Sequence, residues 1–233
     1  MIFEQGHLYH IFNQGNNRQR IFFSRENYLF FLDKVKKHVL PYADILAWCL
    51  MPNHFHFMVY INHLDLPLVD RSLKAHSSSA TSSPAWTNTS SKSHLPQVTQ
   101  GLTSSQTLSS EKKQPLNYSI GVMLRSYTRA INLQENRSGT LFRQQTKANC
   151  LTRVDKISKV WYQSQGVTQI NIDYPDHQYP NICFNYINLN PVKDKLVKRC
   201  EDWEFSSYPD IIGLRKGKLI SRERIAAFGL KLI

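Results

Sequence analysis

Apolar residues near the start of the chain follow first a strand pattern and then a helical one. Residues 7–14 are predicted to form a strand that ends at the turn residues Gly15-Asn16-Asn17. A helix is predicted over residues 25–40, with Ser24 as its N-cap, because apolar residues recur there on one helical face. The residues of that face are Tyr28, Phe31, Leu32, Val35 and Val39.

Two apolar segments follow this helix and predict a hairpin. Residues 43–50 and 54–61 are each suited to a strand, and only Met51-Pro52-Asn53 lies between them. Two strands joined by so short a connection are expected to pair antiparallel.

The second half of the chain again predicts helices and strands. A helix is expected over residues 117–134, and a strand is expected within residues 140–154. A further helix is expected over residues 178–190 and should stop at Pro191, because the residue before a proline is pushed out of the helical region. Residues 160–177 are ambiguous and are assigned to a loop. This alternation predicts an α+β fold, namely a ferredoxin-like (split βαβ) sandwich with an antiparallel sheet and helices on one face.

One stretch departs from the rest in composition. Ser and Thr make up 18 of the 34 residues from Ser77 to Ser110, and acidic residues are absent from it. Such a segment cannot bury enough apolar surface to offset its ordering entropy. Residues 70–115 are therefore expected to be a flexible insertion within one domain that spans residues 1–233.

Charge narrows the choice of partner. The chain of 233 residues has 29 Lys and Arg against 17 Asp and Glu, a net charge of +12, which favours a polyanion such as nucleic acid or an anionic membrane surface. No apolar stretch reaches the length of about 18 residues that a membrane span needs.

The four Cys residues form no CxxC pair, which argues against a zinc ribbon and a disulfide scaffold. A cytoplasmic protein with reduced thiols is expected.

The sharpest local feature is His54-Phe55-His56. Residues two apart in a strand point to the same face, so the two imidazoles would lie side by side while Phe55 enters the core. That arrangement is half of a metal site. The alternative is a pair of ordinary His side chains on the solvent face of an edge strand.

Tyr186 and Asn190 form a second feature. Residues four apart on a helix are neighbours on one face, so a phenol and an amide would project together. The amide oxygen could complete a metal site, and the phenol could be a nucleophile beside it. The alternative is an amphipathic helix with a half-buried Tyr and an Asn that caps its end.

Several stretches together resemble the single-tyrosine HUH transposases, and most closely their REP-associated tyrosine transposase branch. The signature is the run from Trp48 to Val59, in which two His flank a bulky apolar residue. Four further regions agree and keep the family order. They are His10 to Arg18, Ser126 to Arg129 followed by Gly139 to Phe142, Tyr186 to Val192, and Trp203 to Tyr208.

The resemblance implies a metal-dependent enzyme that cleaves and rejoins single-stranded or hairpin DNA through a 5′-phosphotyrosine. It assigns Tyr186 as the nucleophile and His54, His56 and Asn190 as ligands of one divalent ion, Mg or Mn. Two imidazoles alone would favour zinc, manganese or another transition ion over magnesium. Tyr127 is the rival nucleophile, but it shares an apolar helical face with Ile120, Leu124 and Ile131. The resemblance leaves both a monomer and a homodimer open.

Basic residues cluster around these motifs. Residues 122–160 carry eight basic and two acidic side chains, and Lys193 follows the tyrosine helix. The side chains expected to bind nucleic acid are Arg125, Arg129, Arg143, Lys147 and Lys193. A solvated basic surface is the alternative. The sequence leaves two other functions open. One is an inactive nucleic-acid-binding domain of the same fold. The other is a phosphodiesterase that uses water, and the lack of clustered carboxylates near the motifs disfavours that function.

Overall fold

The computed structural model describes residues 1–67, 113–152, 161–164, 167–170 and 175–233. The chain divides into two units, one of Met1–Leu66 with Gln114–Ile233 and one of Pro67–Lys113. Almost all of the second unit lies outside the described residues. So does the predicted flexible insertion at residues 70–115, except for its last three residues, which form a short strand through backbone pairing with residues 65–67. The architecture below is that of the first unit.

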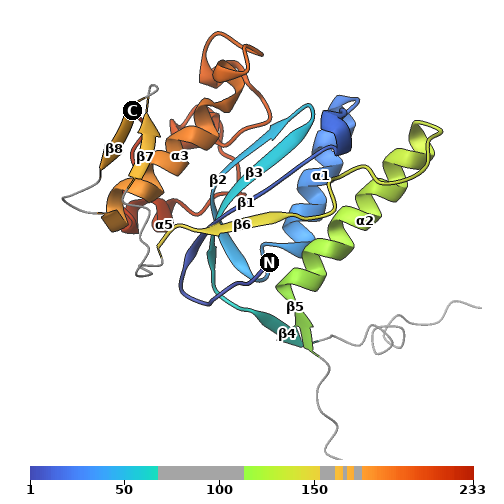
Figure 1. Cartoon of the computed structure of the whole chain (residues 1–233), viewed down its shortest axis with the longest axis horizontal. Helices are drawn as coiled ribbons and strands as arrows, with labels where there is room; N and C mark the ends of the chain where they lie inside the picture. The colour runs from blue at the N-terminus through green and yellow to red at the C-terminus, as the bar shows by residue number, and fades with distance from the viewer. Residues whose placement is uncertain (68–112, 153–160, 165–166, 171–174) are drawn as a thin grey trace, which may run out of the picture. The chain divides into compact units, whose positions relative to one another are not determined.

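A four-stranded antiparallel sheet lies at the centre of this unit (Figure 1). Its strands are β1 (Leu8–Gln14), β2 (Ala43–Met51), β3 (His54–Ile61) and β6 (Lys147–Cys150). They are arranged in the order β2-β3-β1-β6, with β1 between its antiparallel partners β3 and β6. With α1 (Arg25–His38) and α2 (Leu116–Gln134), the chain order is β1-α1-β2-β3-α2-β6. This is the ferredoxin-like split βαβ plan, so the predicted α+β class is confirmed.

The two faces of the sheet follow from the alternation along β3. Phe55, Phe57 and Val59 lie in the main core, together with residues of α1 and α2 such as Phe31 and Tyr127. His54, His56 and Met58 point to the opposite face because side chains alternate along a strand. Met58 belongs to a second, smaller core there.

The prediction of helices on one face only was therefore incomplete. α1 and α2 do share one face, but α3 (Pro175–Lys193) packs against β2 and β3 on the other. The physical reason is that this second face also carries buried apolar side chains, among them Leu8 and Leu46, which need a cover. Phe184 and Ile187 of α3 are fully buried against them.

Two local predictions were wrong. α3 continues through Pro191 to Lys193, because a proline in the last turn removes only one backbone hydrogen bond there. Residues 160–177, assigned to a loop, contain the strand pair β7 (Trp161–Ser164) and β8 (Val167–Ile170) and the first residues of α3.

Short elements complete the described structure. β4 (Asp65–Pro67) pairs with β5 (Lys113–Pro115), and the C-terminal part contains α4 (Tyr208–Ile211) and α5 (Arg222–Ala227). Two 3-10 turns, η1 (Asn16–Arg18) and η3 (Cys200–Asp202), follow β1 and precede α4. The free edge of β2 is covered by the segment before α4, since Ser207 N–H donates to Trp48 O and Leu50 N–H to Phe205 O. No helix in the described ranges has the length and apolarity to cross a membrane.

Candidate active site

The two histidines of the sequence motif lie on the face of the sheet that α3 covers. β3 begins at His54, directly after the turn at Pro52-Asn53, so both imidazoles sit at the same end of the strand. Their ring centroids are 5.0 Å apart. His56 is only 5 % exposed, while His54 is partly open to the surface. The predicted side-by-side arrangement is therefore present.

α3 brings Tyr186 and Asn190 to these histidines. Phe184 and Ile187 anchor the helix in the second core, and this fixes which flank faces the end of β3. The Tyr186 ring lies edge-on to His56 with centroids 5.4 Å apart, and Tyr186 keeps 38 % of its surface exposed. The buried Asn190 side chain lies close enough to His54 to affect its pKa. All four residues named from the two motifs thus meet at one place.

Each imidazole is held at its Nδ1 atom. Nδ1 of His54 lies 2.6 Å from Asn53 Oδ1, and Nδ1 of His56 lies 2.8 Å from Nε2 of His10. An amide oxygen only accepts hydrogen bonds, so His54 donates from Nδ1 and its neutral ring presents a lone pair at Nε2. The second ring nitrogen of each histidine is left for the pocket.

Burial favours the neutral form of both histidines. Desolvation lowers the pKa of His54, opposed by the charge of Asp194 and by the adjacent Asn190 side chain. The pKa of His56 is lowered well below its usual range, first by burial and then by the neighbouring rings of His10 and His54. Neutral imidazole is the form that binds a metal ion.

The orphaned Nε2 atom of His56 makes the site suited to a cation, whereas the orphaned Nδ2 atom of Asn190 is a donor that a cation does not bind. Nε2 of His56 and Nδ2 of Asn190 are buried and have no hydrogen-bond partner among the described residues. Buried polar atoms are nearly always paired, so an unpaired imidazole nitrogen indicates a missing ligand. No group of three or more His, Cys, Asp or Glu in the described ranges could hold an ion, so a third protein ligand has to be of another type, such as the Asn190 amide. The residues present fit one divalent ion held by two imidazoles and an amide oxygen.

The sequence patterns missed two residues of this site, His10 and Asn53. His10 lies on β1, where Phe12 is the register partner of His56 and His10 is the partner of Met58. The His10 and His56 rings are stacked, with centroids 5.0 Å apart. Even-numbered positions of β1 share the histidine face, but that signal becomes usable only when the pairing of β1 with β3 is known.

A pocket of about 210 Å³ opens beside Tyr186. Its lining comes from β1, β3, α3 and the segment that leads into β6: Phe12, Asn13, Gln14, His54, His56, Arg143, Gln145, Lys147 and Tyr186. Among the predicted nucleic-acid contacts, Arg143 and Lys147 therefore face the proposed nucleophile. The Lys193 ammonium lies 5.2 Å from the centre of the Tyr186 ring.

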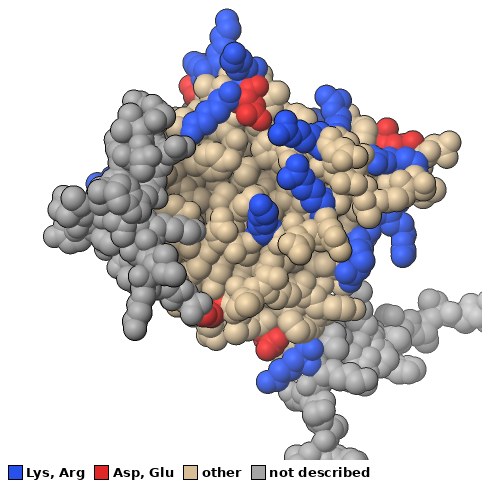
Figure 2. All heavy atoms as spheres, in the orientation of Figure 1, with Lys and Arg blue, Asp and Glu red and all other residues tan. Residues whose placement is uncertain are grey.

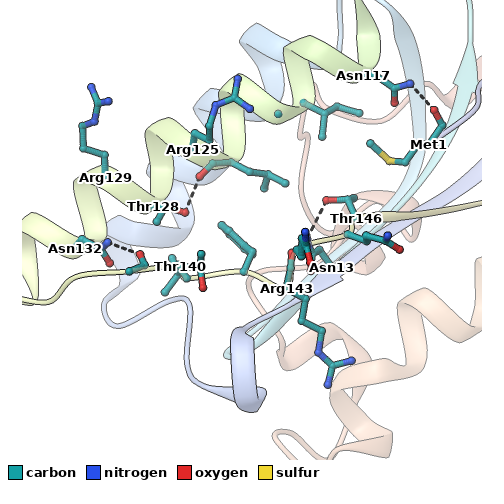
Figure 3. Close-up of a pocket in the computed structure, with 18 residues that line it drawn as sticks. Met1, Asn13, Asn117, Arg125, Thr128, Arg129, Asn132, Thr140, Arg143 and Thr146 are labelled. Atoms are coloured by element: carbon teal, nitrogen blue, oxygen red, sulfur yellow. Dashed lines mark hydrogen bonds between the residues drawn. The ribbon is translucent and has the colours of Figure 1, made fainter.

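Arg125 and Arg129 lie in a separate, larger groove of about 1030 Å³ (Figure 3). Figure 3 shows both side chains rising from α2, with Thr140, Arg143 and Thr146 on the opposite segment. The groove adjoins the pocket beside Tyr186, because Arg143 lines both. Figure 2 shows Lys and Arg side chains gathered over β6 and α2 with few carboxylates between them. A polyanion could follow this surface to the histidines.

Tyr127, the rival nucleophile, is placed in the main core. It is fully buried, and its hydroxyl donates a hydrogen bond to the Ile21 carbonyl at 2.8 Å. Burial raises the pKa of this phenol far above its ordinary value. Its position on the core side of α2 separates it from the histidines by the thickness of the sheet.

No protein-family model matches the chain, and none of the curated proteins matches it significantly. The chain is similar to a solved structure described as a REP-associated tyrosine transposase bound to a REP hairpin. The alignment covers 95 % of each chain, with 14 % identity and a TM-score of 0.47.

Proposed function

We propose that the protein is a single-tyrosine HUH nuclease and transposase that cleaves and rejoins single-stranded DNA. The observation that carries the proposal is the position of Tyr186, whose half-exposed phenol ring lies against His56 while the Nε2 atom of His56 has no partner among the described residues. On this proposal Tyr186 is a nucleophile beside an incomplete metal site, in a pocket that Arg143 and Lys147 also line.

His54, His56 and Asn190 would hold one divalent ion, Mg or Mn. When bound, such an ion supplies Lewis-acid catalysis by drawing charge from a non-bridging oxygen of the scissile phosphate. Two further residues of the chain position the histidines for this role. Asn53 and His10 hold the Nδ1 atoms of the two imidazoles, which orients the rings and keeps their Nε2 atoms directed at the pocket.

Tyr186 performs the covalent step. Its phenol oxygen attacks the phosphorus, the bond from phosphorus to the 3′ oxygen breaks, and the phenol proton is balanced by the proton gained on the released 3′ hydroxyl. The 5′ side stays bound as a phosphotyrosine diester. Because this diester keeps the free energy of the original bond, attack by another 3′ hydroxyl reverses the step and joins strands. The Lys193 ammonium, 5.2 Å from the centre of the Tyr186 ring, adds positive charge beside the phosphate that is attacked.

The substrate must present the phosphate of an unpaired nucleotide to the small pocket beside Tyr186. Arg143 and Lys147 line that pocket, and the adjoining groove extends the basic surface along α2 to Arg125 and Arg129. Single-stranded DNA, or the unpaired flank of a hairpin, fits this arrangement because its backbone can bend into the pocket. Affinity is expected to fall steeply with salt, as it does where phosphates are neutralised by Lys and Arg.

A covalent adduct is the direct test. Labelled hairpin oligonucleotides are incubated with the protein and manganese, and DNA–protein adducts are resolved on a denaturing gel. The wild type and Tyr127→Phe should form the adduct, whereas Tyr186→Phe should form none. Cleavage without an adduct would indicate attack by water. Binding without cleavage in the wild type would identify the chain as an inactive DNA-binding domain of this fold.

A further inference from the structure

A second basic hollow lies at the turn that precedes His54, and neither Arg143 nor Lys147 lines it. It has a volume of about 490 Å³, and its basic lining consists of Arg18, Arg20, Lys193 and Lys195. Asn53, which holds Nδ1 of His54, forms part of its wall. The hollow therefore adjoins the catalytic residues but shares no lining residue with the pocket beside Tyr186.

The backbone at two of these basic residues is unusual. Only four non-glycine residues in the described ranges have a positive φ: Asn17, Arg18, Asn136 and Lys195. Asn visits this left-handed region readily, whereas a long side chain does so at a steric cost. The two that are not Asn, Arg18 at 58° and Lys195 at 59°, both line this hollow.

Lys195 occupies a position that usually belongs to glycine. At the end of α3, Lys195 N–H donates to Val192 O and Leu196 N–H to Pro191 O, the two hydrogen bonds of a Schellman motif. Lys195 is the left-handed residue of that motif, where glycine carries no Cβ penalty. α2 ends in the same motif, with Asn136 in the equivalent place. The motif thus accounts for the conformation of Lys195 but not for the choice of a lysine.

The hollow also carries more positive than negative charge. None of its four basic side chains forms an ion pair with a carboxylate of the described residues, although Asp194 lies in the same lining. Like charges that gather at a strained turn destabilise the free protein, and a bound anion removes that repulsion.

We propose that Arg18 and Lys195 bind a phosphodiester of the DNA strand next to the scissile one. The inference rests on the proposed function and extends it. The strand enters over Arg143 and Lys147, passes Tyr186 and His54, and leaves over Arg18 and Lys195. The basic side chain at each of the two left-handed positions is retained for its charge, at the expense of stability.

Glycine substitutions separate the contribution of the basic charge to DNA binding from the cost of the left-handed backbone to stability. Arg18→Gly and Lys195→Gly are made in a Tyr186→Phe parent, which cannot form an adduct, and Asn136→Gly is the matched control at the end of α2. Melting temperature and affinity for a labelled thymidine oligonucleotide are measured, the latter from about 50 to 200 mM salt. Arg18→Gly and Lys195→Gly should each raise Tm by about 2–4 °C because the backbone strain is relieved. Each should also weaken DNA binding by about fivefold near 0.1 M salt. The salt slope, which is the slope of log affinity against log salt concentration, should become smaller in magnitude by about 0.7.

The control and the parent keep the outcomes distinct. Asn136→Gly should leave affinity and salt slope unchanged. If both glycine variants bind with the parent's affinity and slope while the parent binds DNA normally, the hollow is not a strand site and only this inference fails. A parent that binds no single-stranded DNA would overturn the proposed function together with the inference. If inorganic phosphate raises the Tm of the parent but not of Arg18→Gly, while DNA affinity is unchanged, the ligand is free phosphate and not the strand.

Discussion

The Nε2 atom of His10 lies 2.8 Å from the Nδ1 atom of His56. One of these two nitrogens has to donate the hydrogen and the other has to accept it. If His56 donates, its Nε2 atom presents a lone pair to the pocket. The opposite tautomer would bury an N–H group at Nε2 without a partner among the described residues. His10 therefore selects the His56 tautomer whose Nε2 lone pair faces the pocket, which is the tautomer that the proposed metal site needs.

Replacing His10 separates this role from simple packing. His10→Phe keeps an aromatic ring in the stack but removes the acceptor, and it should weaken binding of Mn by about 10–100-fold. His10→Gln offers an amide oxygen near the position of Nε2 and should restore most of the affinity. Titration calorimetry measures the affinity, and nitrogen NMR of the metal-free protein reports the His56 tautomer. Equal affinity in His10→Phe and wild type, with an unchanged tautomer, would contradict the assignment.

Local patterns predicted the two halves of the site, whereas their assembly into one site followed only from the family resemblance. Alternation along a strand placed His54 and His56 together, and helical spacing placed Tyr186 beside Asn190, because both patterns depend only on local geometry. The approach of the two pairs depends on which face of the sheet α3 covers, and that is decided by the burial of Phe184 and Ile187.

The residues that were missed depend on long-range register. His10 reaches His56 only because β1 pairs with β3 in one alignment, and a shift by one residue would turn it into the main core. The extension of α3 beyond Pro191 was missed for a different reason. The steric rule for the residue before a proline is a preference, and packing of the helix on β2 and β3 overrides it.

Tyr127→Phe should destabilise the fold without affecting adduct formation. The mutation removes a buried hydroxyl that donates to Ile21 O and leaves that carbonyl without this donor. The free energy of unfolding should fall by about 1–3 kcal/mol, as measured by urea denaturation. A loss of the adduct in a variant that is fully folded would give Tyr127 a role in the chemistry and would contradict the placement of the nucleophile at Tyr186.

Asp210 should be one of the most sensitive polar positions in the C-terminal part. Its carboxylate is 1 % exposed, accepts two hydrogen bonds from Arg215 and accepts one from the Gly217 N–H group. Asp210→Ala leaves these donors unsatisfied and should cost about 2–4 kcal/mol of stability.

The contrasting variant is Glu204→Ala. The ion pair of Glu204 with Arg25 is exposed, so its loss should cost less than about 1 kcal/mol. Urea denaturation of the two variants gives the comparison directly. Similar losses in both would show that Asp210 contributes no more than an ordinary surface pair.

The stability of the metal-free protein should decline as the pH falls below about 6.5, the ordinary pKa of histidine. Burial lowers the pKa of His56 in the folded state, so the unfolded chain takes up its proton first, and each further drop in pH favours unfolding until the folded pKa is reached. One such group contributes up to about 1.4 kcal/mol per pH unit.

Urea denaturation in EDTA between about pH 8 and pH 5 measures the slope of the free energy of unfolding against pH, above the range where carboxylates titrate. His56→Gln should reduce the slope but not abolish it, because the pKa of His54 and that of His38 are also lowered by burial. An identical slope in His56→Gln and wild type would mean that His56 takes up its proton equally in the folded and unfolded states.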